Sequence, residues 1–274
     1  MVFYAHWREI FSNKDEYDMR VVIVGSGNVA ESLVLGLNEV GVEVVQIFAR
    51  NEARGRELAA MIGSEWGYDR LAEADLYIIS VSDSAVAEVA ASLPIPEGAV
   101  VAHTTGCCPI EALAPHEHRA VLYPFQTFSA GRKVDFAKGY IFLEAATDHA
   151  LAVVSEVAHR LTSKVEMADG SRRAVIHLSG VFSSNFVNAM YENATEVLAR
   201  EGLSFDVIAP VIEETAAKAL ASRNPRAVQT GPARRGDKPT LERHRAMLAS
   251  DELKREIYDK ISEDIWRKAE ISKR

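Results

Sequence analysis

A glycine turn between an apolar run and a helical pattern constrains the fold of this chain more than any other feature. Residues 20–24, Arg-Val-Val-Ile-Val, form a short β-branched run that is typical of a buried parallel strand. The turn that follows has the pattern G-x-G-x-x-A and consists of Gly25, Ser26, Gly27, Asn28, Val29 and Ala30. In such a turn the two glycines allow a tight bend and a close approach to a pyrophosphate, and the alanine lets the next helix pack on the sheet. We therefore expect residues 25–30 to bind a dinucleotide at the helix N-terminus.

Short apolar runs and helical patterns alternate beyond this turn. We expect further strands at 44–48, 76–81 and 99–102, weaker strands at 66–68, 120–123 and 141–143, and helices at 52–62 and 84–93. This alternation predicts an α/β fold with a doubly wound parallel sheet of the Rossmann kind.

The strand signals stop near residue 169, and the remainder reads as helical. Helices are expected at 171–200, 205–221, 241–249 and 252–269. We therefore predict an N-terminal tail at 1–18, a dinucleotide-binding domain at 19–167, and an all-helical substrate and dimerisation domain at 168–274. The tail either packs on the first domain or lies upstream of an alternative start at Met19.

Composition narrows the partners and the compartment. The 274 residues carry a net charge of -8, which repels nucleic acid. No stretch approaches the roughly 18 uninterrupted apolar residues of a membrane span, and the N-terminus lacks the apolar core of a signal peptide. Cys107 and Cys108 are adjacent and are the only cysteines, which fits a reducing compartment. We expect a cytoplasmic protein with no nucleic-acid or membrane partner.

The end of the second strand indicates which dinucleotide binds. Sites specific for NAD usually place an acidic residue there, whereas this chain has Arg50 and Asn51, with Arg54 one turn further on. Arginine forms charge-assisted hydrogen bonds with a 2′-phosphate, so we expect these three residues to bind NADP(H). Alternatively, Asn51 only caps the next helix and Arg50 is solvated, and Glu52 could weaken the phosphate site.

Polar residues follow three of the later strands, where a Rossmann fold binds its ligand. We expect Ser82, Asp83 and Thr104 to contact the cofactor and Gln126 to contact the substrate. His103 is the best-placed acid/base group, because imidazole titrates near neutrality. The alternative is that His103 bonds the backbone and shapes the pocket, and that Ser82 and Asp83 cap a helix.

Two groups in the helical region are further candidates. Spacing of three and four residues puts His177, Gly180, Ser184 and Asn188 on one face of the long helix, with Asn185 beside it. Of these we assign His177 and Asn185 to catalysis and Ser184 to substrate binding, although a solvated face is an equal alternative. Arg234 and Arg235, in a Gly/Pro-rich loop, either bind an anionic group of the substrate or form a surface turn.

Other chemistries find little support in the sequence. His116 and His118 are the only close histidine pair, and no cysteine or carboxylate cluster completes a metal site, so we expect no metal. Nothing marks Cys107 as an activated nucleophile. No G-x-S-x-G motif is present, which excludes an α/β-hydrolase.

Five motifs resemble, in the same order, those of candidate NADP oxidoreductases that join a Rossmann-like domain to a helical domain of unassigned function. They are residues 25–30, 80–83, 103–106, 123–128 and 230–237, and the resemblance covers nearly all of the chain from Met19 onward. More distantly, the chain is similar to pyrroline-5-carboxylate reductase, deazaflavin-dependent NADP reductases and 3-hydroxyacid dehydrogenases. The resemblance implies a homodimer formed through the helical domain. The helix Lys of the hydroxyacid dehydrogenases is missing, and His177 and Asn185 occupy the comparable helix.

Together these features predict an NADP(H)-dependent oxidoreductase. It would transfer a hydride to or from a small carbonyl, imine or hydroxy compound. Two alternatives stay open: a dinucleotide-binding sensor without turnover, and a deazaflavin-linked NADP reductase that needs a second redox cofactor.

Overall fold

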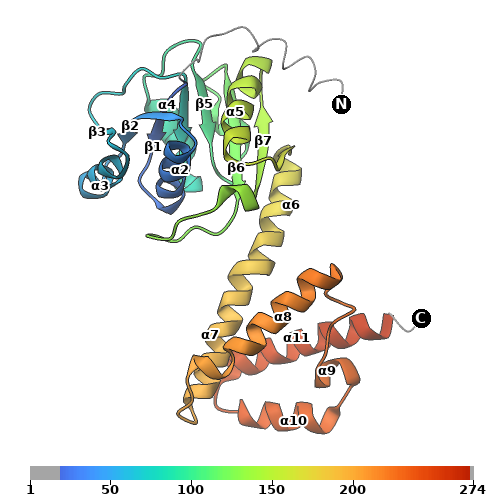
Figure 1. The fold of residues 1–274 in the computed structure, drawn as a ribbon. Helices are drawn as coiled ribbons and strands as arrows, with labels where there is room; N and C mark the ends of the chain where they lie inside the picture. The colour runs from blue at the N-terminus through green and yellow to red at the C-terminus, as the bar shows by residue number, and fades with distance from the viewer. Residues whose placement is uncertain (1–18, 272–274) are drawn as a thin grey trace. The chain divides into compact units, whose positions relative to one another are not determined.

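The computed structural model describes residues 19–271, and the expectations for residues 1–18 lie outside them. Its centre is one sheet in the order β3-β2-β1-β4-β5-β6-β7-β8 (Figure 1). All neighbouring strands are parallel except β6 and β7. The strands are β1 (Arg20–Val24), β2 (Glu43–Phe48), β3 (Glu65–Gly67), β4 (Leu76–Ile79), β5 (Val100–His103), β6 (Arg119–Phe125), β7 (Tyr140–Ala145) and β8 (Val165–Met167). The order 3-2-1-4-5-6 is that of the Rossmann fold, so the predicted fold class is confirmed.

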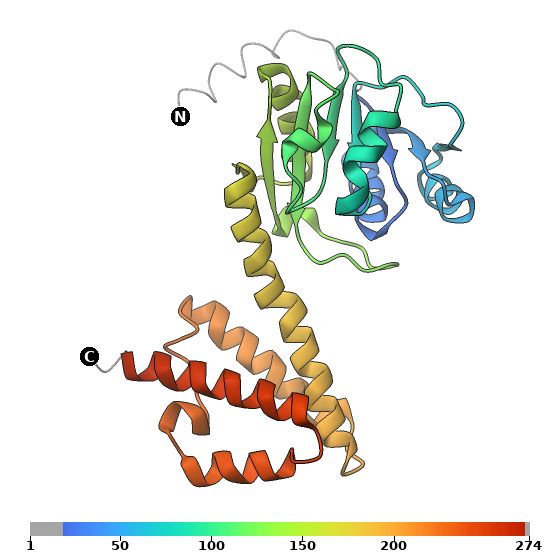
Figure 2. The same cartoon turned by 180° about the vertical axis from the view of Figure 1, so that it is seen from behind.

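Helices cover both faces of this sheet, as Figures 1 and 2 show from opposite sides. They are α2 (Asn28–Glu39), α3 (Glu52–Ile62), α4 (Val86–Ser92) and α5 (Asp148–Leu161), with 3₁₀ turns η1 (Asp83–Ala85), η2 (Ile110–Leu113) and η3 (Phe136–Lys138). Strand side chains alternate between the faces: Val21 packs with the α2 and α5 side, and Val22 with the α4 and η2 side. Helix α5 was not predicted from the sequence.

The C-terminal part of the described chain is helical, as predicted. It contains α6 (Gly170–Gly180), η4 (Val181–Asn185), α7 (Phe186–Ala199), η5 (Phe205–Val207), α8 (Ala209–Ser222), α9 (Pro232–Arg235), α10 (Lys238–Met247) and α11 (Glu252–Ile271). The long helix expected at 171–200 is present, but η4 interrupts it with a π turn. The short helix α9 lies where only a loop was expected.

The chain divides into two compact units between Ser184 and Asn185. We call residues 19–184 the sheet unit and residues 185–271 the helical unit, and each is described by itself. The division lies within the continuous helix formed by α6, η4 and α7. None of the helices between residues 19 and 271 is both long and apolar enough to cross a lipid bilayer.

Candidate active site

The glycine turn has the geometry that a dinucleotide site needs. Gly25 has φ +119°, and a Cβ built there would lie 2.2 Å from the carbonyl oxygen of Ser80. No other residue fits this position, because both the backbone conformation and the space exclude a side chain. Gly27 precedes α2 without any side-chain cap, and a Cβ built on it would meet nothing within 4 Å. Gly27 and Asn28 are exposed and no side chain caps the first amides of α2, which leaves these amides available to a pyrophosphate.

The three residues expected to bind the 2′-phosphate, at the end of β2 and the start of α3, differ in their contacts. Asn51 caps α3, because its Oδ1 accepts the backbone N–H of Arg54 at 3.1 Å. The guanidinium of Arg54 pairs with Glu31 and also with Glu57, 2.6 Å away. Arg50 is exposed and its side chain has no polar partner within residues 19–271. Of the two arginines, Arg50 is therefore the one available to an anion.

The strand ends after β4 and β5 lie side by side. Ile79, the last residue of β4, pairs with His103 at the end of β5. Thr104 is buried, and its Oγ1 donates weakly to Ser80 Oγ at 3.5 Å. Ser82 and Asp83 are exposed, and neither side chain caps the short turn η1. The capping alternative is not what the structure shows, and a cofactor role for Ser82, Asp83 and Thr104 stays a prediction.

His103 has surroundings that favour a structural role. Its side chain is completely buried, and its Nδ1 accepts the backbone N–H of Thr105 at 3.2 Å. Burial lowers the pKa of His103 to about 4; the charge of Arg173 acts in the same direction, and the carbonyl of Pro109 opposes it. The ring is therefore neutral near pH 7 and is a poor proton donor there. This geometry favours the alternative in which His103 shapes the turn after β5.

A contact that the sequence did not reveal joins Tyr123 to His177. The hydroxyl of Tyr123 on β6 lies 3.2 Å from Nδ1 of His177 on α6. Burial raises the pKa of Tyr123 to about 12, and the charges of Cys107 and Asp83 add to this while Arg173 opposes it. Tyr123 therefore stays protonated at neutral pH, beside a half-buried imidazole. The sequence placed Tyr123 at a strand end and marked His177 on a helix face, but it held no signal that these two residues, 54 positions apart, are in contact.

Two glycines let α6 come close enough for this contact. A Cβ on Gly106, in the loop after β5, would lie 2.6–2.9 Å from side-chain atoms of His177. A Cβ on Gly180 would lie 2.7 Å from the ring of Phe125, which ends β6. Any larger residue at either position would push α6 away from the strand ends. His177 and Gly180, which the sequence placed on one polar face of the helix, therefore pack against the loop after β5 and against β6.

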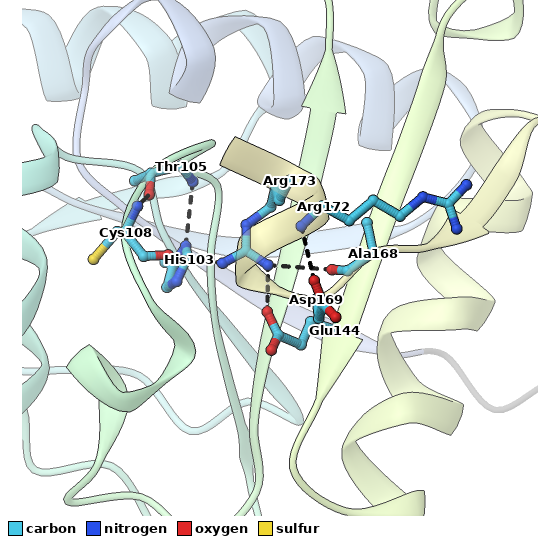
Figure 3. A network of polar contacts seen from close by, with 8 residues as sticks. All are labelled: His103, Thr105, Cys108, Glu144, Ala168, Asp169, Arg172 and Arg173. Atoms are coloured by element: carbon cyan, nitrogen blue, oxygen red, sulfur yellow. Dashed lines mark hydrogen bonds and ion pairs between the residues drawn. The ribbon is translucent and has the colours of Figure 1, made fainter. Parts of the chain in front are cut away.

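A buried arginine fixes the start of α6 (Figure 3). Arg173 is 1% exposed, forms an ion pair with Glu144 on β7, and donates to the carbonyl oxygens of Cys108 and Ala168. A buried charge is tolerated only with such partners. Because His177 follows Arg173 by four residues, one turn along the same face, this network sets the position of His177. The sequence offered one sign of this ion pair: Glu144 is an acidic residue in an otherwise apolar strand. The predicted strand, 141–143, ended one residue before it.

Three further predicted site residues have different surroundings: Gln126 and Ser184, expected to bind substrate, and Asn185, expected to act in catalysis. Gln126 is exposed, and its Oε1 accepts the backbone N–H of Thr127 at 2.8 Å. Ser184 and Asn185 lie in the π turn η4, a type of distortion that is frequent at functional sites. Their roles, and that of Gln126, stay predictions.

The two arginines predicted to bind an anionic group of the substrate, Arg234 and Arg235, have different surroundings. Arg234 donates to the carbonyl oxygen of Arg226 at 2.9 Å, which orders the segment before α9. Arg235 is exposed. Gly236 ends α9 at φ +68° and packs against Trp266, so the glycines of this motif serve the local fold. Substrate binding by either arginine stays a prediction.

Within residues 19–271 no group of three or more histidine, cysteine, aspartate or glutamate side chains could hold a metal ion.

Residues 20–105 match the family described as "NADP oxidoreductase coenzyme F420-dependent", and residues 139–265 match a domain of unknown function. No curated protein matches the chain.

Solved structures extend this likeness over both units. A Bacteroides fragilis protein, provisionally described as an NADP oxidoreductase, is 37% identical with a TM-score of 0.86, over 91% of this chain and 98% of that one. A Thermotoga maritima protein is 23% identical with a TM-score of 0.77, over 91% and 99% of the two chains. The fold is also that of a reductive aminase from Aspergillus terreus, solved with NADPH and ethyl levulinate, at 15% identity and a TM-score of 0.69 over 91% and 93%.

Proposed function

The chain belongs to the NADP oxidoreductase family that includes the Bacteroides fragilis protein, and from this premise we propose that it reduces a small carbonyl or imine compound with NADPH. The observation that carries the proposal is the pair formed by Tyr123 and His177. Reduction of C=O or C=N needs a proton as well as a hydride, and a phenol hydrogen-bonded to an imidazole can supply it.

The pair lies toward the cofactor side of the sheet. Tyr123 is two residues from the end of β6, and the carboxylate of Asp83, which follows β4, acts on its pKa. Ligands of Rossmann folds bind at these carboxyl ends, beside the point where the strand order reverses. The open space at Gly27 and the free guanidinium of Arg50 fit the pyrophosphate and the 2′-phosphate of NADP(H) at the same edge.

When bound, NADPH supplies the hydride to the substrate carbon. Tyr123 would donate its phenolic proton to the substrate oxygen or nitrogen as negative charge develops there. His177, in the tautomer that carries its proton on Nδ1, would replace that proton across the 3.2 Å contact, and the half-buried ring would take up another from water. The product is an alcohol or an amine, so the hydride and the proton are both accounted for. Arg173 and Glu144 act by holding α6, and His103 acts by shaping the β5 loop.

The substrate class rests on the same proton source and on the structural relatives. The Aspergillus reductive aminase was solved with a keto ester, and imine reductases from Streptomyces aurantiacus and Aspergillus terreus share the fold at 13–16% identity. A neutral phenol donor with a pKa near 12 suits both carbonyl and imine reduction, since it stays protonated throughout the neutral range.

The test is NADPH oxidation against a panel of small ketones, aldehydes and cyclic imines, with Tyr123→Phe as the key variant. We expect this change to lower kcat by roughly 10²–10⁴ and to leave NADPH affinity unchanged, as for loss of a general acid. Tyr140→Phe is the matched control, because Tyr140 is an exposed tyrosine on β7. Full turnover by Tyr123→Phe would remove the pair from the mechanism, and no oxidation with any panel member would contradict the substrate class.

A second candidate is a deazaflavin-linked NADP reductase. It is favoured by the description of the family that matches residues 20–105, which names coenzyme F420. The two candidates differ in one assay. Substrate-dependent oxidation of NADPH without a deazaflavin supports the first, whereas oxidation only when the deazaflavin is present supports the second.

We also propose that the protein is a cytoplasmic homodimer that assembles through the helical unit. The helical unit leaves large apolar side chains exposed, among them Leu220, Leu253, Met247 and Val211 at 63–77% exposure. Exposed apolar side chains that gather into a large patch mark interaction sites, and we propose that these side chains belong to one. Both cysteines are free thiols and the net charge is -8, which support a reducing compartment and disfavour nucleic acid as a partner.

A further inference from the structure

The segment between β6 and β7, residues 126–139, runs along the carboxyl ends of the parallel strands toward α2. Figures 1 and 2 show this course from both sides. We call residues 126–133 the strap. It is tied to α2 along the length of that helix by three contacts: Asn28 Nδ2 to Phe128 O at 3.4 Å, Gly131 N to Glu31 Oε1 at 3.1 Å, and Lys133 Nζ to Glu39 Oε1 at 2.9 Å.

Glu31 is the central tie. It is 4% exposed in the first turn of α2, and a carboxylate in that position is costly unless both oxygens are satisfied. One oxygen accepts from Arg54 at the start of α3, and the other accepts the backbone N–H of Gly131. A single carboxylate therefore links the first turn of α3 to the strap.

The strap turns sharply at this point. The N–H of Arg132 donates to the carbonyl oxygen of Ser129 at 3.2 Å, and Gly131 adopts φ +69°, as the third residue of such a turn requires. Arg132 is exposed, and its side chain has no hydrogen bond or ion pair within residues 19–271. Arg50, which follows β2, is likewise exposed and has no side-chain hydrogen bond or ion pair within the described residues. Arg132 directly follows Gly131, which contacts Glu31, and Arg50 precedes Arg54 by four residues, so both unpaired guanidiniums belong to segments that meet at Glu31. The guanidinium of Arg54 is itself occupied by Glu31 and Glu57.

We propose that Arg132 is a ligand of the 2′-phosphate of NADP(H), opposite Arg50. Arg54 and Glu31 are positioning residues in this site: Arg54 is committed to carboxylates, and Glu31 fixes the strap. The phosphate would take the place between the β2 turn and the strap, at the end of β2 where Rossmann folds recognise the adenosine ribose. Two arginines on a dianion give charge-assisted hydrogen bonds that a ribose hydroxyl cannot replace.

This inference rests on the NADP(H) preference stated above, and its test separates the two. Calorimetric titrations with NADPH and with NADH would compare the unmodified protein with Arg132→Gln. We expect about a tenfold weaker Kd for NADPH and an unchanged Kd for NADH. Arg20→Gln, an exposed arginine at the amino end of β1, is the matched control and should change neither.

Two further variants probe the geometry. Arg50→Gln/Arg132→Gln should bind NADPH no better than NADH. Gly131→Ala keeps both arginines but strains the turn, so it should weaken NADPH binding without affecting NADH. Circular dichroism and thermal melts would verify that each variant is folded.

Each result has a clear meaning. Unchanged NADPH affinity in Arg132→Gln overturns the strap site while leaving the cofactor assignment intact. Equal losses for NADPH and NADH also overturn it, because Arg132 would then bind a group common to both. If the unmodified protein binds NADPH no more tightly than NADH, the preference itself fails, and the strap site fails with it.

Discussion

The sheet unit and the helical unit bury their residues very differently. The sheet unit has three clusters of buried apolar side chains, on both faces of the sheet and beside β6. In the described part of the helical unit, the buried residues are Ala233, Leu248 and Ser262. A helix pattern specifies an apolar stripe but not what covers it. The sheet unit therefore has its own core, whereas the helical unit needs another surface, for which we propose a second copy.

The strongest contrast concerns ion pairs. Glu144→Leu would leave the fully buried Arg173 with carbonyl partners alone and should cost about 3–5 kcal/mol in unfolding free energy. Lys254→Met, which breaks contacts to Glu196 and Asp251 in the helical unit, should cost less, because the side chain of Glu196 is 52% exposed and neither carboxylate would be left beside a fully buried charge. Urea unfolding of both variants measures the difference.

A double variant separates charge from packing. Glu144→Leu/Arg173→Met should recover most of the lost stability, because two apolar residues of similar size replace the pair. If Lys254→Met and Glu144→Leu lowered the unfolding free energy equally, the contrast between the two units would be contradicted.

The next effect is pH-dependent and belongs to the sheet unit. The folded pKa of His103, about 4, lies below its unfolded value near 6.5, because burial disfavours the charged ring. Between these values only the unfolded chain binds the proton, so stability falls as pH drops from 6.5 to 4, by roughly 3 kcal/mol in all. His103→Asn keeps an acceptor for Thr105 N–H and removes the titration.

The difference in unfolding free energy between wild type and His103→Asn should therefore shrink as pH falls through this window. Turnover by the variant should persist at pH 7 if the ring only shapes the loop. A variant that is folded but inactive would restore His103 to the acid/base role, and a constant difference across the window would contradict the buried neutral ring.

The smallest effect on folding, and the one that tests the helical unit, is expected for Leu220→Glu. Leu220 is 77% exposed, so within one chain the change should alter stability by about 0.5 kcal/mol or less. If a second copy covers α8, the same change places a charge in the interface and shifts the protein toward monomer. Sedimentation equilibrium of both proteins decides this. A 30.1 kDa species in the unmodified protein would contradict the dimer.

Much of the fold could be predicted because its signals are local. Apolar β-branched runs gave β1, β2, β4 and β5, and the G-x-G-x-x-A pattern gave the turn with Gly25 at positive φ. Helix α5 was missed, although its Ala, Val and Leu side chains pack on the sheet with four-residue spacing. The π turn η4 was missed as well, because no residue type in positions 181–185 demands it.

The candidate site was only partly visible from the sequence. His177 was singled out by helical spacing, but Tyr123, Arg173 and Glu144 gained their importance only from contacts across 29 to 65 residues of chain. For Arg54, in contrast, the sequence suggested a role that its contacts do not favour. Its position after β2 predicted a phosphate ligand, yet Glu31 and Glu57 occupy its guanidinium.

The sequence by itself determined the Rossmann fold, the helical second half and the dinucleotide turn, because backbone preference and apolar periodicity act over a few neighbouring residues. Only the tertiary structure decided which polar side chains are free to react. Burial lowers the pKa of His103, which favours a structural role for its ring, and a buried ion pair sets α6 so that His177 meets Tyr123. Charge state and hydrogen bonding depend on neighbours that the fold brings together, and no local pattern records them.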